Sequence, residues 1–215
     1  MTANRLYAVI TADVIDSRHI ESFRHKRDAK LRPLSRLHLR DKLIVSEFAV
    51  TAWDEFQTVL SKPSAVPRVV LDLRRNFYPM QLWIALGLGK VSEPRKKPVN
   101  QFAGGEAFER ARLGAERLKD DKAGKDRPLT WFISGDEVFD LIANTIYRLH
   151  DTLLQDVSPK QWETILAQTK MGSQELAAKK LAVNVSTVSR NLRRAHFWQM
   201  EETCKAVEKI IQAYF

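Results

Sequence analysis

The chain has few of the features that mark exported, membrane-spanning or zinc-binding proteins. Its 215 residues include one cysteine, Cys204, so it can form neither an internal disulfide nor a thiolate zinc site, and a reducing compartment is expected. The longest apolar runs, such as residues 82–89, fall well short of the roughly 20 residues that span a bilayer, and residues 1–13 contain no secretory apolar segment. The five histidines lack HxxxH and HExxH spacing, and no GxxxxGK[ST] phosphate loop occurs. We therefore expect a cytoplasmic protein without a zinc site.

What the sequence has in excess is positive charge. Thirty-five Lys and Arg residues against 26 Asp and Glu residues give a formal net charge of +9. This excess must be solvated, neutralised by anions or laid against a polyanion, and nucleic acid or nucleotide is the leading class of partner. Many proteins are basic without binding nucleic acid. The position of the charge along the chain must therefore decide whether it indicates a nucleic-acid partner.

Two regions of different pattern follow one another along the chain. As far as about residue 155, short apolar runs alternate with amphipathic stretches, which is typical of a sheet covered by helices. The expected strands are 6–12, 43–51, 56–60, 82–88 and 129–133, and the expected helices are about 22–40, 64–76, 105–119 and 136–154. After that point all apolar residues follow a helical period. We therefore predict an α/β domain over 1–155, a ferredoxin-like palm (βαββαβ) with one additional strand and helix, and an all-α domain over 156–215.

Residues 172–195 predict a helix-turn-helix within the all-α domain. Ser173 and Asn184 are expected to cap two short helices that are separated by a break at 182–184. The positions expected to be buried are Leu176, Ala177 and Leu181 in the first helix and Val188, Leu192 and Ala195 in the second. Two such helices joined by a tight turn form the helix-turn-helix, whose second helix is shaped to enter a major groove.

The exposed face of the second helix has the composition of a DNA-contacting surface. No acidic residue occurs from Asn184 to Gln199. The side chains expected on this face are Ser186, Thr187, Ser189, Arg190, Arg193 and Arg194. Short hydroxyl side chains allow close approach to base edges, while arginines reach phosphates or a guanine edge. Double-stranded DNA is therefore the expected partner, and a plain helical bundle for protein contacts is the alternative.

Residues 172–195 resemble the helix-turn-helix of sigma-factor-like and repressor-type regulators, with the recurring form ELAxxLGVSxSTVSRxLxRA. One departure is Ala182, which stands at the turn position where glycine usually relieves a positive φ. Behind this segment, residues 197–215 predict a terminal helix with an apolar face. That helix either packs on its own domain or forms a homodimer contact, which would suit a palindromic site.

Two acidic motifs stand where strands of the α/β domain are expected to end. Asp13 ends the first strand, and Asp54 lies with Glu55 in the turn of a hairpin. In a βαββαβ sheet the first strand and this hairpin are central neighbours, so Asp13 and Asp54 are candidate ligands for Mg²⁺ and a nucleotide phosphate. An aspartate at a strand end is also a common cap or turn former, and that alternative stays open.

The order of the motifs ADVIDSR, DEFQ, LWIALGLGKV and GGEAFERAR is similar to the SatD family, whose N-terminal part resembles class III nucleotidyl cyclase and GGDEF domains. The resemblance implies that Asp13 and Asp54 correspond to the two metal-binding aspartates and that residues 105–112 correspond to a helix of the cyclase site. Three residues depart from the cyclase pattern: Trp53 replaces a glycine, Glu109 the catalytic asparagine and Leu113 the transition-state arginine. These departures favour retained nucleotide or metal binding over retained cyclisation.

The sequence as a whole favours a SatD-like regulator, in which a cyclase-like domain binds a nucleotide effector or metal and a helix-turn-helix binds DNA. A Mg²⁺-dependent nucleotidyl cyclase or transferase is the first alternative. A protein-interaction adaptor without catalysis is the second.

Overall fold

The computed structural model describes residues 5–92, 99, 104–120 and 127–215. The strands are β1 (Tyr7–Val14), β2 (Ala49–Val50), β3 (Glu55–Leu60), β4 (Leu82–Gly89) and β5 (Thr130–Ile133). The α-helices are α1 (Phe23–Arg40), α2 (Val66–Phe77), α3 (Glu106–Lys119), α4 (Glu137–Gln155), α5 (Pro159–Met171), α6 (Gln174–Leu181), α7 (Val185–Arg194) and α8 (Phe197–Tyr214). Two short 3₁₀ turns, η1 (Ser17–His19) and η2 (Pro63–Ala65), precede α1 and α2. As far as residue 155 the elements follow the predicted order βαββαβαβα.

The five strands form one sheet in the order β2-β3-β1-β4-β5. All neighbouring strands are antiparallel except β4 and β5, which are parallel. The longest pairings are those of β1 with β3 and with β4, so β1 occupies the centre of the sheet. The chain is therefore a mixed α/β protein whose first strand and β2–β3 hairpin are adjacent.

The prediction of a long strand over 43–51 was wrong in extent, because only Ala49–Val50 pairs as a strand. The segment before it has one backbone hydrogen bond to β3, from the Val45 N–H to the Val59 carbonyl at 2.7 Å, and is otherwise held by side chains. The Phe48 N–H donates to Ser35 Oγ at 3.1 Å, and the Ser46 carbonyl accepts from Thr58 Oγ1 at 3.0 Å. Apolar composition alone does not reveal such side-chain partners, and for this reason the whole of segment 43–51 was predicted as a strand.

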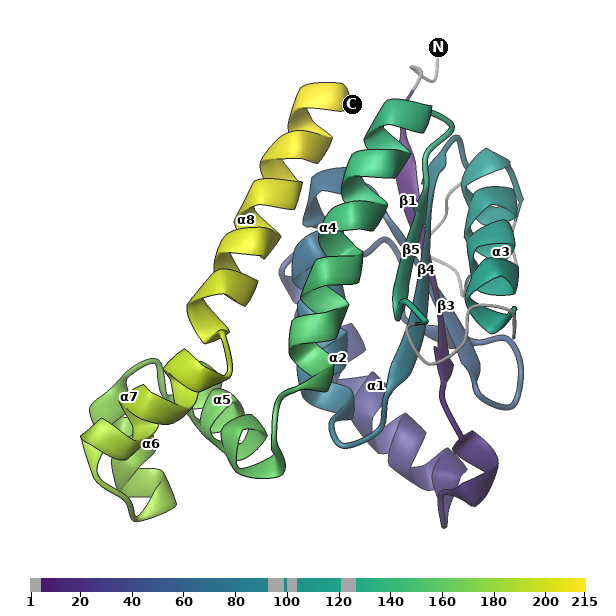
Figure 1. The fold of residues 1–215 in the computed structure, drawn as a ribbon. Coiled ribbons are helices and arrows are strands. Elements are labelled where there is room, and N and C mark those ends of the chain that lie inside the picture. The colour runs from purple at the N-terminus through teal and green to yellow at the C-terminus, as the bar shows by residue number, and fades with distance from the viewer. Residues whose placement is uncertain (1–4, 93–98, 100–103, 121–126) are drawn as a thin grey trace.

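The two faces of the sheet are covered unequally (Figure 1). Ile10 and Phe56 belong to the large core that the sheet forms with α1, α2 and α4, whereas Val9 and Val59 face α3. Successive side chains of a strand point to opposite faces, so the other odd-numbered positions of β1 and β3 also face α3. This alternation decides which polar residues meet beneath α3.

The C-terminal helices divide between two cores. Helices α5, α6 and α7 enclose a small core of their own, to which the start of α8 also contributes. The remainder of α8 runs alongside α4 (Figure 1), and its Val207 and Ile211 are buried in the core of the α/β region. Arg75 on α2 forms an ion pair with Glu201 on α8. The apolar face of α8 is therefore covered within the chain. Among the described residues, no helix has the length and apolarity needed to cross a membrane.

Candidate functional site

Two short helices, α6 and α7, lie where the sequence predicts them. Ser173 Oγ accepts a hydrogen bond from the Leu176 N–H at 3.2 Å and so caps α6. Asn184 stands at the N-cap position of α7, but its side chain makes no capping hydrogen bond. The predicted burial of Leu176 was wrong, since 51% of this residue is exposed. Ala177 is buried as predicted, and Leu181 is half-buried. Ala178 is buried beside Ala177, because small side chains let the short helix approach its neighbours closely.

The turn between α6 and α7 keeps a left-handed residue although that residue is not glycine. Ala182 has φ 52° and ψ 44°, so the conformation usual for glycine at this turn position is kept. Its N–H donates to the carbonyls of Ala178 and Lys179, and the Val183 N–H also donates to Ala178, so the last carbonyls of α6 find partners in the turn. The strain of an alanine in this conformation is of order 1–2 kcal/mol.

The inner face of α7 fixes the helix on α5. Val188, Leu192 and Ala195 are fully buried, as predicted. Asn191 Nδ2 donates to Thr164 Oγ1 on α5 at 3.0 Å, and Thr164 is itself buried. An apolar stripe and one polar clamp therefore set the rotation of α7, and with it the direction of the opposite face.

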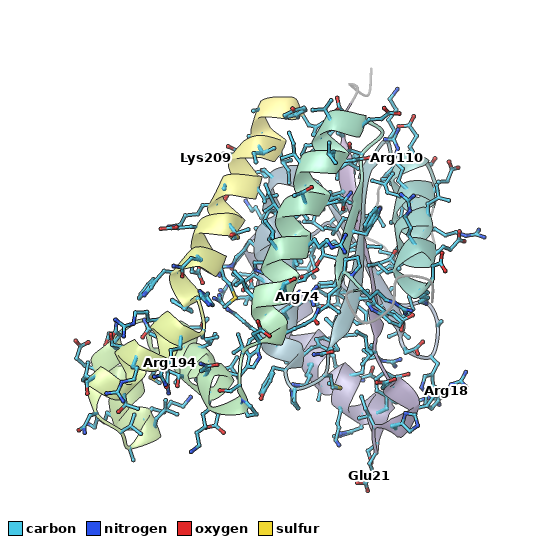
Figure 2. All side chains as sticks on the ribbon, viewed as in Figure 1. Arg18, Glu21, Arg74, Arg110, Arg194 and Lys209 are labelled. Carbon is cyan, nitrogen blue, oxygen red and sulfur yellow. The ribbon has the colours of Figure 1, made fainter. Side chains whose placement is uncertain are left out.

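That opposite face is basic and polar. The described surface of α7 carries Ser186, Ser189, Arg190, Arg193 and Arg194 as exposed residues and Thr187 as a half-buried one. None of the three guanidinium groups forms a hydrogen bond or ion pair with another described residue, and Figure 2 shows Arg194 among the C-terminal helices, apart from the sheet. The spacing 190, 193, 194 places all three on one side of the helix. The face therefore presents three uncompensated cations to the solvent.

A second candidate site lies beneath α3, on the other part of the molecule. Asp13 on β1 is paired in register with Glu55 on β3, and Thr11 with Gln57. Directly opposed residues project to the same face, so these four polar side chains all face α3. Thr11, Glu55 and Gln57 line the floor of a cleft under that helix. The cleft has a volume of about 620 Å³. Arg112 and Lys119 of α3, together with the Gly104–Gly105 turn before that helix, also line it.

Close packing of α3 on β4 forms the side of this cleft. A Cβ atom at Gly87 would overlap the carbonyl oxygen of Ala107, and one at Gly89 would approach Glu106 Cβ to 2.8 Å. Both glycines are required here because the helix backbone lies directly on the strand. Glu109 lines the cleft, whereas Leu113 does not and is 54% exposed.

Asp13 is held by a cation of this chain. Its carboxylate forms an ion pair with Lys119 at the end of α3. Burial is the largest influence on Asp13 and raises its pKa; the hydrogen bond and charge of Lys119 oppose this, while the charges of Asp54 and Glu55 add to it. Burial would lower the pKa of Lys119, but the hydrogen bond and charge of Asp13 outweigh that effect and raise it. Lys119 is therefore charged at neutral pH.

Asp54 is close enough to influence Asp13 but has a different partner. Its carboxylate accepts a hydrogen bond from Ser17 Oγ at 2.7 Å, in the turn after β1. No group of three His, Cys, Asp or Glu side chains within the described ranges is placed to hold a metal ion. The two aspartates therefore have different partners in the structure, Lys119 for Asp13 and Ser17 for Asp54.

Sequence reasoning missed two residues that shape these sites. Lys119 was expected only as the last residue of the helix over 105–119, without a role in a site. Asn191 was passed over as a polar residue of α7, although it is the clamp to α5. Neither position carries a signal in a single sequence, because each has a partner from a distant part of the chain.

Comparison with known proteins adds one finding at the level of family. The SatD family model matches residues 7–196, which span both candidate sites. None of the curated proteins matches the chain significantly.

Proposed function

The chain belongs to the SatD family, and from that premise and the geometry of α7 we propose that it is a DNA-binding regulatory protein. The observation that carries the proposal is the solvent-exposed face of α7, with three unpaired arginines and no carboxylate. In this proposal α6 and α7 form a helix-turn-helix, and α7 is the helix that enters the major groove. The α/β region is a ferredoxin-like palm that binds an effector.

The chemistry of the α7 face supports duplex DNA over an acidic protein. Ser186 and Ser189 are exposed in the first half of the helix, where short side chains allow the backbone to approach base edges. The arginines follow one and two turns later, at distances from the N-terminus that suit phosphates or a guanine edge. Cations that face a polyanion release its condensed counterions, and binding should therefore weaken steeply as salt is added.

The proposal is tested by fluorescence anisotropy with a labelled mixed-sequence duplex, titrated at about 50 to 200 mM salt. The variant Arg190→Ala/Arg193→Ala/Arg194→Ala should bind weakly, with the slope of log K against log salt reduced by about three. The matched control is Arg148→Ala/Lys205→Ala/Lys209→Ala, which removes the same charge from exposed positions on α4 and α8; Figure 2 shows Lys209 far from Arg194. The control should bind like the wild type.

Equal binding by both triple variants would contradict the proposal, because net charge and not α7 would then decide affinity. Absence of duplex binding by the wild type would favour the adaptor alternative. Circular dichroism and urea unfolding show whether each variant is folded.

A second candidate function, nucleotide binding, is favoured by the cleft beneath α3. Lys119 and Arg112 on its wall supply positive charge for phosphates, and the hydroxyl of buried Thr11 on its floor has no hydrogen-bond partner in the described part of the chain. Mg²⁺ would have to displace Lys119 from Asp13, so no metal-dependent step is assigned to these residues. The cyclase alternative also lacks its asparagine and arginine, since Glu109 and Leu113 occupy those places.

Isothermal titration calorimetry with ATP and GTP, with and without Mg²⁺, tests this second function. Binding should be weaker in Lys119→Met and unchanged in Arg36→Met, an exposed cation on α1 outside the cleft. Formation of a cyclic or linear oligonucleotide product, lost in Asp54→Ala, would favour the enzyme alternative.

A further inference from the structure

A pocket of about 280 Å³ lies where the α/β region meets α5. The loop between α2 and β4, the end of α4 and the start of α5 all contribute to its walls. Tyr78 of that loop stacks on Trp162 of α5, with ring centroids 4.9 Å apart and an angle of 22° between the ring planes. Both residues line the pocket. It therefore lies against the aromatic contact that joins the two regions.

The pocket offers no free charge to a ligand. Arg74 is the one charged side chain among the described residues that line it. Its guanidinium donates to the Leu82 carbonyl at 3.1 Å, to Thr130 Oγ1 at 2.7 Å and to Asp151 Oδ1 at 3.2 Å. Because Asp151 neutralises the guanidinium, a phosphate or carboxylate would be desolvated here without a counterion. The pocket therefore suits an uncharged ligand.

The remaining lining combines apolar surfaces with two carboxamides. Leu82 and Leu154 are buried and supply apolar surface beside the two rings. Gln81 and Gln155 are exposed residues, and neither side chain makes a hydrogen bond to another described residue. A carboxamide presents one donor and one acceptor side by side, the pattern that pairs with the donor and acceptor edge of adenine. The volume lies near the lower end of the range for small-molecule sites, which limits the ligand to one or two rings.

We propose that this pocket binds an uncharged, purine-sized ring compound whose edge carries a hydrogen-bond donor and acceptor, and that its binding changes the DNA affinity of α7. A ligand here touches Gln81 in the α/β region and Trp162 in α5 at once. Any movement of α5 relative to the sheet therefore changes the free energy of ligand binding, and the coupling is reciprocal. The binding site stands on the pocket alone, whereas the coupling rests on the proposed function.

The site is tested first without DNA, on the full chain, with adenine as the probe. Calorimetry should show saturable binding, and adenine should raise the melting temperature by mass action. Indole, a ring of similar size without an acceptor edge, should bind more weakly, and AMP should also bind more weakly because its phosphate finds no free cation. Absence of saturable binding by both adenine and indole overturns the site.

Two variants locate the binding. Gln81→Ala/Gln155→Ala removes both carboxamides and should weaken adenine binding about thirtyfold, from roughly 1 kcal/mol for each of two lost hydrogen bonds. Gln155→Trp places a ring at the mouth of the pocket and should abolish binding. The matched control Gln199→Ala/Gln212→Ala removes two exposed carboxamides of α8 and should leave adenine binding unchanged. Equal binding by the wild type and Gln155→Trp overturns the assignment to this pocket.

The coupling is tested by repeating the duplex titration at saturating adenine. The dissociation constant for DNA should change at least threefold in the wild type and not at all in Gln155→Trp. Unchanged DNA affinity in the wild type overturns the coupling and leaves the site intact. If the protein binds no duplex, the proposed function fails, while the calorimetry still decides the site.

Discussion

The two regions of the molecule use their cations in opposite ways. In the α/β region, Arg74 is buried together with its partner Asp151, and Lys119 pairs with the buried Asp13. On α7 the three arginines have no such partners among the described residues. A paired, buried cation contributes to folding, and a ligand must compete with its partner. An unpaired, exposed cation contributes little to folding and is available to an external anion.

The largest loss of stability is expected for Arg74→Met, which removes a cation that is buried and paired. Asp151 is 1% exposed and would keep hydrogen bonds from the Leu129 N–H and Thr130, but it would lose its counter-charge. Removing one partner of a buried pair typically lowers the free energy of unfolding by about 3–5 kcal/mol. Urea unfolding followed by circular dichroism measures the change.

The matched control makes the same substitution at an unpaired, exposed position. Arg190→Met should change the free energy of unfolding by no more than about 0.5 kcal/mol, as is usual for surface substitutions. Losses of similar size in the two variants would abolish the distinction between a structural and a free cation.

The next effect distinguishes the arginines of α7 from one another. Arg190 lies nearer the N-terminus of the helix, and Arg190→Ala should reduce discrimination between bases by about 1–3 kcal/mol if its guanidinium pairs with guanine. Arg194 lies at the end of the helix, and Arg194→Ala should weaken all duplexes alike and lower the salt slope by about one. Competition between single-base variants of a selected duplex measures both. Identical base preferences in the two variants would contradict this division.

The sequence predicted regular elements well where their pattern is local. The helix from 174 to 181 and its Ser173 cap follow from periodicity and capping chemistry, and the structure confirms both. The predictions failed where residues distant in the sequence determine the local structure or burial. Segment 43–51 departs from a strand because Ser35 and Thr58 bind its backbone, and Leu176 is exposed because alanines make the contacts of α6.

The sequence predicted the α7 face in more detail than the cleft beneath α3. The α7 face could be listed residue by residue, because a helical period places side chains without knowledge of the rest of the fold. The cleft could not be derived in this way. That Asp13 opposes Glu55 depends on strand register, and that Lys119 reaches Asp13 depends on how α3 crosses the sheet.

A smaller effect is expected when Lys119, which pairs with Asp13, is replaced. In Lys119→Met, Asp13 loses the interaction that lowers its pKa, while burial and the charges of Asp54 and Glu55 remain. The pKa of Asp13, already raised in the wild type, should therefore rise further. Carbon-13 NMR titration of the carboxyl group measures this. Arg112→Met, at an exposed position on the same helix, is the control and should leave the Asp13 titration unchanged.

The sign of the stability change follows from the direction of this shift. A carboxyl group whose pKa is raised on folding binds protons more tightly in the folded state, so its contribution to stability is largest below its unfolded pKa and is lost as pH rises through the folded pKa. In Lys119→Met this decline should extend to higher pH than in the wild type. The same variant tests metal binding at Asp13. Mg²⁺ should raise the melting temperature of Lys119→Met more than that of the wild type, because no lysine competes for Asp13. The additional stabilisation should be absent from Asp13→Asn/Lys119→Met. A Mg²⁺ response independent of Asp13 would remove the aspartate from any metal site.

The smallest effect concerns the turn that aims α7. Ala182→Gly relieves the left-handed strain of about 1–2 kcal/mol, but it also gives the unfolded chain more conformational freedom, worth about 0.4–1 kcal/mol. The difference predicts a net gain of roughly 0.5 kcal/mol in the free energy of unfolding, measurable by urea titration. Ala206→Gly, at an exposed position within α8 where φ is helical, should instead lose about 0.5–1 kcal/mol. Because Ala182 is exposed and bears no charge, the gain in stability should leave the salt dependence of DNA binding unchanged, whereas a loss of stability in Ala182→Gly would show that alanine is not strained in this turn.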